Sequence, residues 1–355
     1  MHVPDGFINV PVSAVTGVVA AGAVAVSLKG ARRELDERTA PLAGLVAAFI
    51  FAVQMLNFPV AAGTSGHLLG GALAAILVGP CTGVLCVSVV LLMQGILFAD
   101  GGLTALGVNI TDMAIVTTVV GYAVFRGLVK VLPRGRRSVT VAAFVSALLS
   151  VPAAAVAFTL IYAVGGTTDV SLSKVATAMI GVHVLIGIGE AVITALTVGA
   201  VIAVRPDLVY GARGLKQNLR LRVNGELVDA PEPVTAPAPA RTSHRKVWIT
   251  GLVTSLVLAG FVSFYASASP DGLEKVAADK GIDKKAEEHA AADSPLADYG
   301  VKDVSDARLS GGLAGVIGVG VTVVAGSAVF WAVRRRRGGD SSPASVPSVP
   351  ESDSV

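Results

Sequence analysis

KVATAMIGVHVLIGIGEAVITALTVGAVIA, residues 174–203, is the longest apolar run in this sequence of 355 residues. Lys174, His183 and Glu190 are its only ionisable residues. About 20 apolar residues are enough for a helix to cross a bilayer. Inside a bilayer every backbone N–H and C=O group must be bonded within the protein, so this run predicts a transmembrane helix.

Runs of the same kind recur along most of the chain. Hydrophobic residues make up 53% of the sequence, charged residues make up 15%, and the mean hydropathy is +0.71. This composition excludes a water-soluble domain. We therefore predict an all-α polytopic transmembrane helical bundle in the cell (plasma) membrane. Further spans are expected at residues 8–28, 41–60, 82–98, 107–130, 138–164, 247–266 and 311–333.

A shorter apolar segment, residues 67–79, decides the number of crossings. It is rich in glycine and ends at Gly79-Pro80, so a short span, a broken helix and a re-entrant segment are all open. If it crosses, the chain has about nine spans, and 21 of its 28 Lys and Arg residues fall in the loops of one side. Because such residues favour the cytoplasmic side, we expect the N-terminus outside and the C-terminus in the cytoplasm.

A Pro- and Ala-rich stretch at residues 231–239 divides the chain into two modules. Its composition predicts an extended linker, and the Ser-, Pro- and Gly-rich end of the chain predicts a disordered tail. The expected parts are a first module of seven spans at 1–210, a cytoplasmic linker at 211–246, a second module of two spans at 247–337 with an extracytoplasmic loop at 267–310, and a tail at 338–355.

The first two residues, Met1 and His2, carry the most specific chemistry in the sequence. A terminal amine, the amide nitrogen of residue 2 and the imidazole of residue 2 can close two fused chelate rings around one cation. Because Pro4 has no N–H, amide deprotonation could not continue far along the chain. A fourth donor is then required, and His67 is the histidine that the short outside loops offer.

Four nitrogen donors in a plane favour a late transition metal. Ni(II), Cu(II) and low-spin Co(II) accept such a set, whereas Mg(II) and Ca(II) prefer oxygen and Zn(II) prefers a tetrahedron. By spacing alone, however, His2 and His67 are also compatible with an ordinary terminal residue and an ordinary loop histidine.

Several motifs resemble those of a known family. The opening MHVPDGF, residues 1–7, resembles the N-terminal signature of the substrate-capture membrane subunit of nickel/cobalt energy-coupling-factor transporters. Residues 66–71, 94–107 and 187–191 are similar to further family motifs, so the resemblance covers the first module. It implies that the Met1 amine, the His2 amide and imidazole, and the His67 imidazole hold the metal. It also implies a transmembrane coupling subunit and two cytoplasmic ATPase subunits as partners.

The second module carries a motif of its own. Residues 269–274, SPDGLE, resemble the motif of the accessory two-helix component of these transporters, here fused to the capture subunit. Without the resemblance, Pro-Asp-Gly is simply a turn signal. The fusion is more similar to the nickel branch of the family, so Ni(II) is expected as the transported ion in preference to Co(II). The residues of the motif that we single out are Pro270, Asp271, Gly272, Leu273 and Glu274.

Three polar residues, Asp112, His183 and Glu190, fall inside predicted spans. Such residues are costly in a membrane and should face the bundle interior or a water-filled path. His183 and Glu190 are seven residues apart, which places both on one helix face. A metal or proton relay and a hydrogen-bonded structural pair are both open, and the pair is favoured.

The sequence predicts a transporter subunit rather than an enzyme. It contains no phosphate-binding loop, no His-Glu-x-x-His motif and no serine nucleophile elbow. No cofactor and no nucleic-acid partner are expected. The expected function is the substrate-specific component of an ATP-driven transition-metal importer. The alternatives are a cobalt-specific component of the same family, a self-sufficient secondary metal-cation transporter that uses the three intramembrane residues, and a metal sensor.

Overall fold

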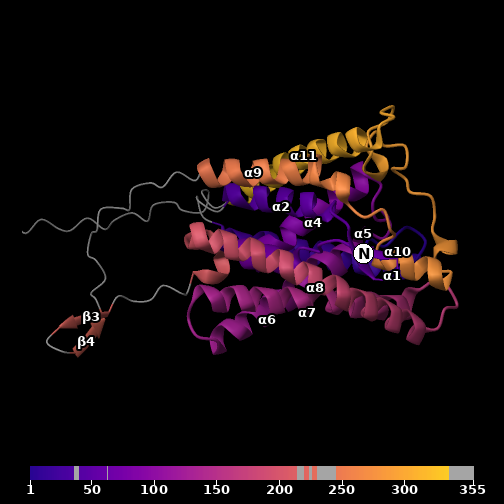
Figure 1. Cartoon of the computed structure of the whole chain (residues 1–355). Coiled ribbons are helices and arrows are strands. Elements are labelled where there is room, and N and C mark those ends of the chain that lie inside the picture. The colour runs from indigo at the N-terminus through magenta and orange to yellow at the C-terminus, as the bar shows by residue number, and fades with distance from the viewer. Residues whose placement is uncertain (36–39, 62, 214–219, 224–225, 230–244, 336–355) are drawn as a thin grey trace, which may run out of the picture.

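The computed structural model describes all residues except 36–39, 62, 214–219, 224–225, 230–244 and 336–355. Its helices lie side by side in one bundle (Figure 1). Seven of the described helices are long and apolar enough to cross a membrane, which confirms the predicted polytopic helical fold. They are α1 (Val10–Glu34), α4 (Pro80–Leu97), the continuous segment Leu106–Val131, α7 (Arg136–Gly165), α8 (Leu172–Val204), α9 (Arg245–Gly260) with the turn η4 (Val262–Tyr265), and α11 (Ala307–Arg335).

The remaining described elements are short. The segment Leu106–Val131 consists of α5 (Leu106–Asn109), the π-helix η1 (Ile110–Val116) and α6 (Thr117–Val131). Two antiparallel hairpins pair β1 (Phe58–Ala61) with β2 (Thr64–Gly66), and β3 (Arg220–Val223) with β4 (Glu226–Asp229). The other short elements are α2 (Ala40–Gln54), α3 (Gly71–Val78), η2 (Pro206–Leu208), η3 (Tyr210–Ala212), α10 (Gly272–Lys280), η5 (Asp283–Lys285) and η6 (Ala297–Tyr299). The Pro/Ala-rich part of the predicted linker and the predicted tail lie outside the described residues.

The segment 67–79 is partly irregular and partly helical. Its helix α3 has eight residues and is about 12 Å long, too short for a hydrocarbon core of about 30 Å. His67 lies beside the first residue of the chain, whereas Gly79 packs against Glu34 at the far end of α1. The Glu34 carboxylate also accepts hydrogen bonds from the first N–H groups of α4. The segment therefore connects the level of Met1 with the level of Glu34 in the bundle. The nine crossings and the outside N-terminus stay predictions.

The accessory helices α9 and α11 pack against α2 of the capture module. Small residues line these contacts: Gly44 of α2 lies against Ser327 of α11, and Gly315 of α11 lies against the backbone of Ala259 in α9. Small side chains let helix backbones approach closely, which is how helices associate in lipid. One continuous core of buried residues includes side chains from both modules.

Candidate metal centre

The N-terminal tail is extended and is bonded to the loop and helix that follow α4. The Val3 N–H donates to Asn109 Oδ1 at 2.7 Å, and Asn109 Nδ2 donates to the Val3 carbonyl at 3.1 Å. The Asp5 carboxylate accepts from two backbone N–H groups of the same loop. These bonds draw the start of the chain into the bundle, where Met1 is 2% exposed.

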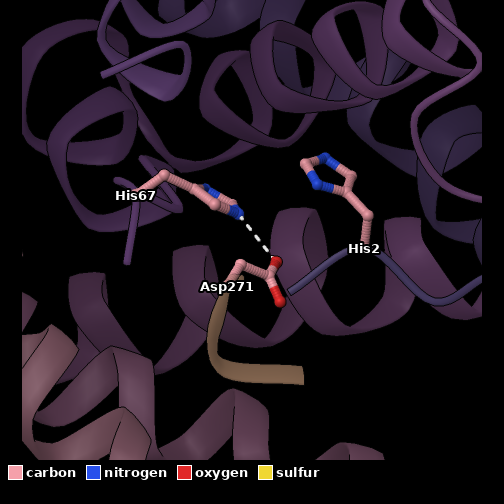
Figure 2. Close-up of side chains that lie close together, drawn as sticks. All are labelled: His2, His67 and Asp271. Carbon is pink, nitrogen blue, oxygen red and sulfur yellow. Dashed lines mark ion pairs between the residues drawn. The ribbon is translucent and has the colours of Figure 1, made fainter. Parts of the chain in front are cut away.

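The Met1 amine lies at the centre of a buried cluster. Its nitrogen is 2.7 Å from His67 Nε2 and 2.5 Å from Asp271 Oδ2. The rings of His2 and His67 stack with their centroids 5.1 Å apart. One ligand atom each of His2, His67 and Asp271 lie within 4.8 Å of one another, and Figure 2 shows these three side chains around a common centre. We call Met1, His2, His67 and Asp271 the candidate metal centre, or metal centre for short.

Asp271 is held by the helix that it begins. It is the N-cap of α10, where its Oδ1 accepts from the Glu274 N–H while Glu274 accepts from the Asp271 N–H. Burial would raise the pKa of Asp271, but the Met1 amine and His67 outweigh burial and hold that pKa well below its usual range. The carboxylate is therefore ionised at neutral pH, and it offers the cluster an oxygen that comes from the accessory module.

The accessory loop lies over the metal centre, and we call residues 267–301 the cover. Ser65, two residues before His67, donates its N–H to the Pro270 carbonyl and its hydroxyl to the Ser269 carbonyl. Farther along the cover, the Glu287 N–H donates to the Asp5 carbonyl at 3.0 Å. The cover is thus bonded both to the His67 loop and to the N-terminal tail.

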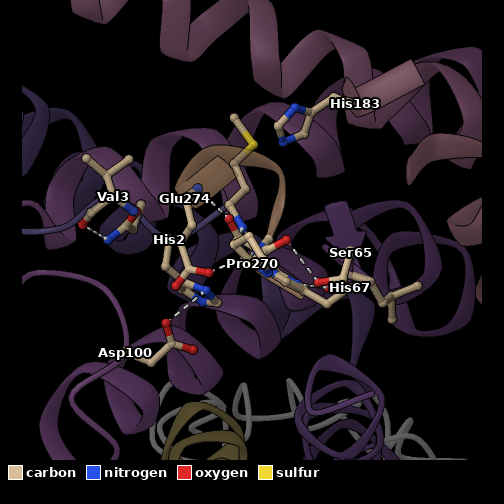
Figure 3. A network of polar contacts seen from close by, with 12 residues as sticks. His2, Val3, Ser65, His67, Asp100, His183, Pro270 and Glu274 are labelled. Carbon is tan, nitrogen blue, oxygen red and sulfur yellow. Dashed lines mark hydrogen bonds and ion pairs between the residues drawn. The ribbon is translucent and has the colours of Figure 1, made fainter. Parts of the chain in front are cut away.

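Both ring nitrogens of His2 have polar partners. Nδ1 lies 3.2 Å from Asp100 Oδ1, and Nε2 lies 3.1 Å from Gln94 Oε1. Tyr299 of the cover bonds to both of these partners: its hydroxyl donates to Asp100 at 2.6 Å and accepts from Gln94 at 3.0 Å. Burial lowers the pKa of His2 to about 4, against the opposing effect of Asp100, so its imidazole is neutral at pH 7. Figure 3 shows His2 facing Asp100.

The tautomer of His67 suits a metal ligand. Its Nδ1 lies 3.0 Å from the Leu68 carbonyl, which can only accept a hydrogen bond. A neutral ring that donates from Nδ1 has its lone pair on Nε2, the atom beside the Met1 amine. Histidines that bind metals commonly donate their second ring N–H to a carbonyl in this way.

The backbone N–H of His2, unlike that of Val3, can lose its proton when a metal ion binds without first breaking a hydrogen bond. Among the described residues it has no hydrogen-bond acceptor, whereas the N–H of Val3 is bonded to Asn109. Deprotonation of the His2 amide would therefore break no hydrogen bond.

The predicted pair of His183 and Glu190 is wrong as a direct contact, although both side chains are buried on α8. Glu190 accepts from the N–H groups of Leu69 and Gly70 at 2.6 and 3.1 Å. His183 Nδ1 instead lies 2.7 Å from the Met179 carbonyl. The two residues lie two turns apart on α8, about 10.5 Å along its axis, which is too far for a direct hydrogen bond.

Asp112 lies in the π-helix η1 and is 1% exposed. Its two carboxylate oxygens have no hydrogen-bond partner in the described part of the chain. The group of three potential metal ligands found there is His2, His67 and Asp271, so the structure does not gather Asp112, His183 and Glu190 into one site.

Several residues of this region escaped the sequence analysis. Asp271 was identified only through its motif, and its place beside the amine depends on a contact across 270 residues. Gln94 and Asp100 lie inside the 94–107 motif. The available signal for a role of Asp100 was that it is an acidic residue in a loop without Lys or Arg. Nothing in the sequence marks Tyr299.

Comparison with known proteins places both modules in known families. Residues 2–208 match the family described as cobalt uptake substrate-specific transmembrane region (CbiM), and residues 245–335 match the PDGLE domain. The fused nickel transport protein NikMN of Rhodobacter capsulatus is 42% identical over 125 residues, 35% of this chain and 36% of that protein. The cobalt transport protein CbiM of Geobacter sulfurreducens is 30% identical over 293 residues, 79% of each chain.

A solved structure supports the same assignment. The crystal structure of a transition metal transporter is 29% identical, covers 57% of this chain and 93% of that chain, and has a TM-score of 0.50. The family match extends over residues 2–208, more than half of the sequence. It includes the N-terminal tail from His2 onward, the His67 loop and α8. The chain therefore belongs to the CbiM family of substrate-specific membrane components of metal uptake, and it carries a PDGLE domain behind its family region.

Proposed function

We propose that this chain is the substrate-specific component of an ATP-driven importer and that it captures Ni(II), in preference to Co(II), at its N-terminus. The observation that carries the proposal is the position of the Met1 amine, 2.7 Å from His67 Nε2. The next nitrogen along the chain is the unbonded His2 amide. Relatives named as nickel and cobalt transport proteins support the same function.

The proposed ligands are four nitrogens: the Met1 amine, the His2 amide, His2 Nδ1 and His67 Nε2. Ring closure through the amide uses Nδ1, because this atom gives a six-membered chelate ring. Since Nδ1 faces Asp100 in the structure, the imidazole must turn away from Asp100 when the ion binds. The amine must likewise lose its proton and its ion pair with Asp271.

An amine, a deprotonated amide and two imidazoles form a strong planar donor set that suits both Ni(II) and low-spin Co(II), so the preference for nickel rests on the fusion of the two modules. The relative from Rhodobacter capsulatus, named as a nickel transporter, supports this choice. The longer match to a cobalt transport protein makes a cobalt-specific component the second candidate. Competition between the two ions for the purified chain distinguishes these candidates.

The proposed energy source lies in other subunits, because the sequence has no phosphate-binding loop. A transmembrane coupling subunit and a pair of ATPase subunits are the proposed partners. We expect uptake of radioactive nickel by cells only when these subunits are coexpressed with the chain. Full, saturable uptake by the chain alone would instead support a secondary transporter.

The experiment that tests the chelate inserts two leucines between Met1 and His2. The insertion preserves every native side chain, keeps the initiator Met1 because leucine is bulky, and moves the amine so that it can no longer close a five-membered chelate ring with the His2 amide. Nickel affinity of the purified chain, with a native and untagged N-terminus, should fall at least about tenfold, or about 1.4 kcal/mol. His2→Ala and His67→Ala should have the same effect, while the controls His244→Ala and His289→Ala should be nearly silent. Unchanged affinity after the insertion refutes the N-terminal chelate.

A further inference from the structure

His183 on α8 presents a buried nitrogen that the proposed capture site does not use. The side chain is fully buried, and its Nδ1 lies 2.7 Å from the Met179 carbonyl. Because a carbonyl can only accept, Nδ1 carries the hydrogen, and the lone pair of the neutral ring is on Nε2. That Nε2 has no hydrogen-bond partner within the described residues.

The ring of His183 borders the metal centre. A Cβ atom at Gly272, the residue after Asp271, would lie 3.1 Å from His183 Cε1. One helical turn along α8, Ile186 contacts Gly66, the residue before His67. Figure 3 shows His183 beside the polar network with one ring nitrogen turned toward it. His183 is nevertheless outside the compact group of His2, His67 and Asp271, so it occupies a neighbouring position.

The arrangement of His183 repeats that of His67. Each ring donates its Nδ1–H to a backbone carbonyl. His67 Nε2 lies beside the Met1 amine, and His183 Nε2 has no hydrogen-bond partner within the described residues. A buried lone pair without a donor forgoes a hydrogen bond that it would make in water, so in native proteins such an atom is normally paired with a protein group, an ordered water or a ligand. A carbonyl that accepts from Nδ1 in this way fixes the ring orientation of a metal-binding histidine.

We propose that His183 Nε2 is the ligand that takes the metal ion from the capture site in the step that follows capture. The proposal rests on the proposed function, whose four nitrogens already complete capture without His183. The same helix face carries Glu190, which holds the loop after His67 through the Leu69 and Gly70 N–H groups. A movement of α8 therefore changes the position of the transfer ligand and the support of a capture ligand together.

The test compares His183→Cys with His183→Ser, which have similar size but differ in their ability to bind nickel. Each variant is assayed for equilibrium nickel binding on the purified full chain, and for radioactive nickel uptake with coexpressed coupling and ATPase subunits. We expect affinity within about twofold of wild type for both variants. Uptake should fall at least about tenfold with serine and recover at least about threefold with cysteine. Thr194→Ala is the matched control. Thr194 lies on the same helix, and its buried hydroxyl also has no hydrogen-bond partner within the described residues.

Three outcomes overturn the proposal. Equal uptake by the cysteine and serine variants shows that ligation at this position is irrelevant. Loss of equilibrium binding by both variants, with the wild-type size-exclusion profile retained, places His183 in capture rather than in transfer. A comparable loss of uptake in Thr194→Ala shows a general effect of disturbing α8. A separate result refutes the proposed function: the wild-type chain binds neither nickel nor cobalt. Because this inference rests on the proposed function, the same result refutes it as well.

Discussion

The Met1 amine is paired with a carboxylate in the structure, and this pairing affects how a metal can bind. The nitrogen lies 2.5 Å from Asp271 Oδ2, where it carries its proton as an ammonium group. An ammonium group has no lone pair for a metal ion. Asp271 and the ion therefore compete for the same nitrogen, even though the carboxylate itself could act as an oxygen ligand.

This competition predicts the effect of removing Asp271. We expect Asp271→Ala to keep nickel affinity within about threefold of wild type or to raise it, while His67→Ala lowers it at least about tenfold. Calorimetric titration of the two purified variants measures the difference, with Asp271→Asn as a control that retains side-chain size. A tenfold loss in both Asp271 variants, with the fold intact, would make Asp271 a ligand.

Proton release provides a second test at the residue scale. Burial lowers the pKa of His2 to about 4, so between about pH 5 and 7 its imidazole has no proton to lose. The amine and the His2 amide must each lose one, so we expect about two protons released per ion. Affinity should then fall about a hundredfold for each pH unit on acidification, and below about pH 4 protonation of His2 adds to the loss. Calorimetry in buffers of different ionisation enthalpy counts the protons, and a count near one would exclude the amide.

At the scale of elements, α8 supports the loop that carries His67. The Glu190 carboxylate accepts from Leu69 at 2.6 Å and from Gly70 at 3.1 Å. Gly70 has a φ of 87°, a left-handed conformation that suits glycine and begins α3. The loop conformation therefore depends on a carboxylate from a distant helix.

We predict that Glu190→Ala destabilises the chain and weakens metal binding. Two buried N–H groups would lose their acceptor, at about 1–3 kcal/mol each. Glu190→Gln retains one acceptor oxygen and should fall between wild type and alanine in both properties. Thermal unfolding in detergent and nickel titration measure the two effects, and a wild-type affinity in Glu190→Ala would contradict the supporting role.

The helical elements were predictable because their apolar runs exceed the bilayer length, but irregular elements were not. The run at 41–60 ends as helix at Gln54 and continues as β1, where Pro59 lacks the N–H that a helix needs. The run at 107–130 contains the π-helix η1, and no residue in this run predicts the π-helical hydrogen-bond pattern. Periodicity indicates which segments are helical, but it does not reveal where their hydrogen bonds change register.

The candidate site was predictable only where its chemistry is local. Met1 and His2 are neighbours in the chain, and the structure places His67 beside them. Asp271 and Tyr299 reach the site only through packing of the second module, so their positions depend on contacts that no local pattern encodes. The ligand roles of all these residues stay predictions until binding is measured.

At the scale of the whole molecule, the two modules share a core and a site. The accessory helices pack on α2, and their loop forms the cover. Truncation after Pro239 removes the accessory helices and the cover, and it leaves every proposed nitrogen ligand in place. We therefore expect equilibrium nickel binding within about threefold of the full chain, together with lower thermal stability and reduced uptake.

Binding, uptake and helix content of the truncated chain should be measured in the same preparation. The Asp271→Ala full-length variant is the matched control, because it removes only the carboxylate. If binding disappears while the first module remains folded, the deleted part contains a ligand, and Asp271 is the candidate.

Under the proposed function, the cover also affects how quickly an ion exchanges with its surroundings. Met1, His2, His67 and Asp271 are all buried, and residues 267–301 are bonded to both the N-terminal tail and the His67 loop. We expect arrival and departure of a bound ion to share the step in which these residues separate, so that its residence time depends on that step as well as on its ligands. A chelator in the medium would then strip the ion no faster than the cover opens.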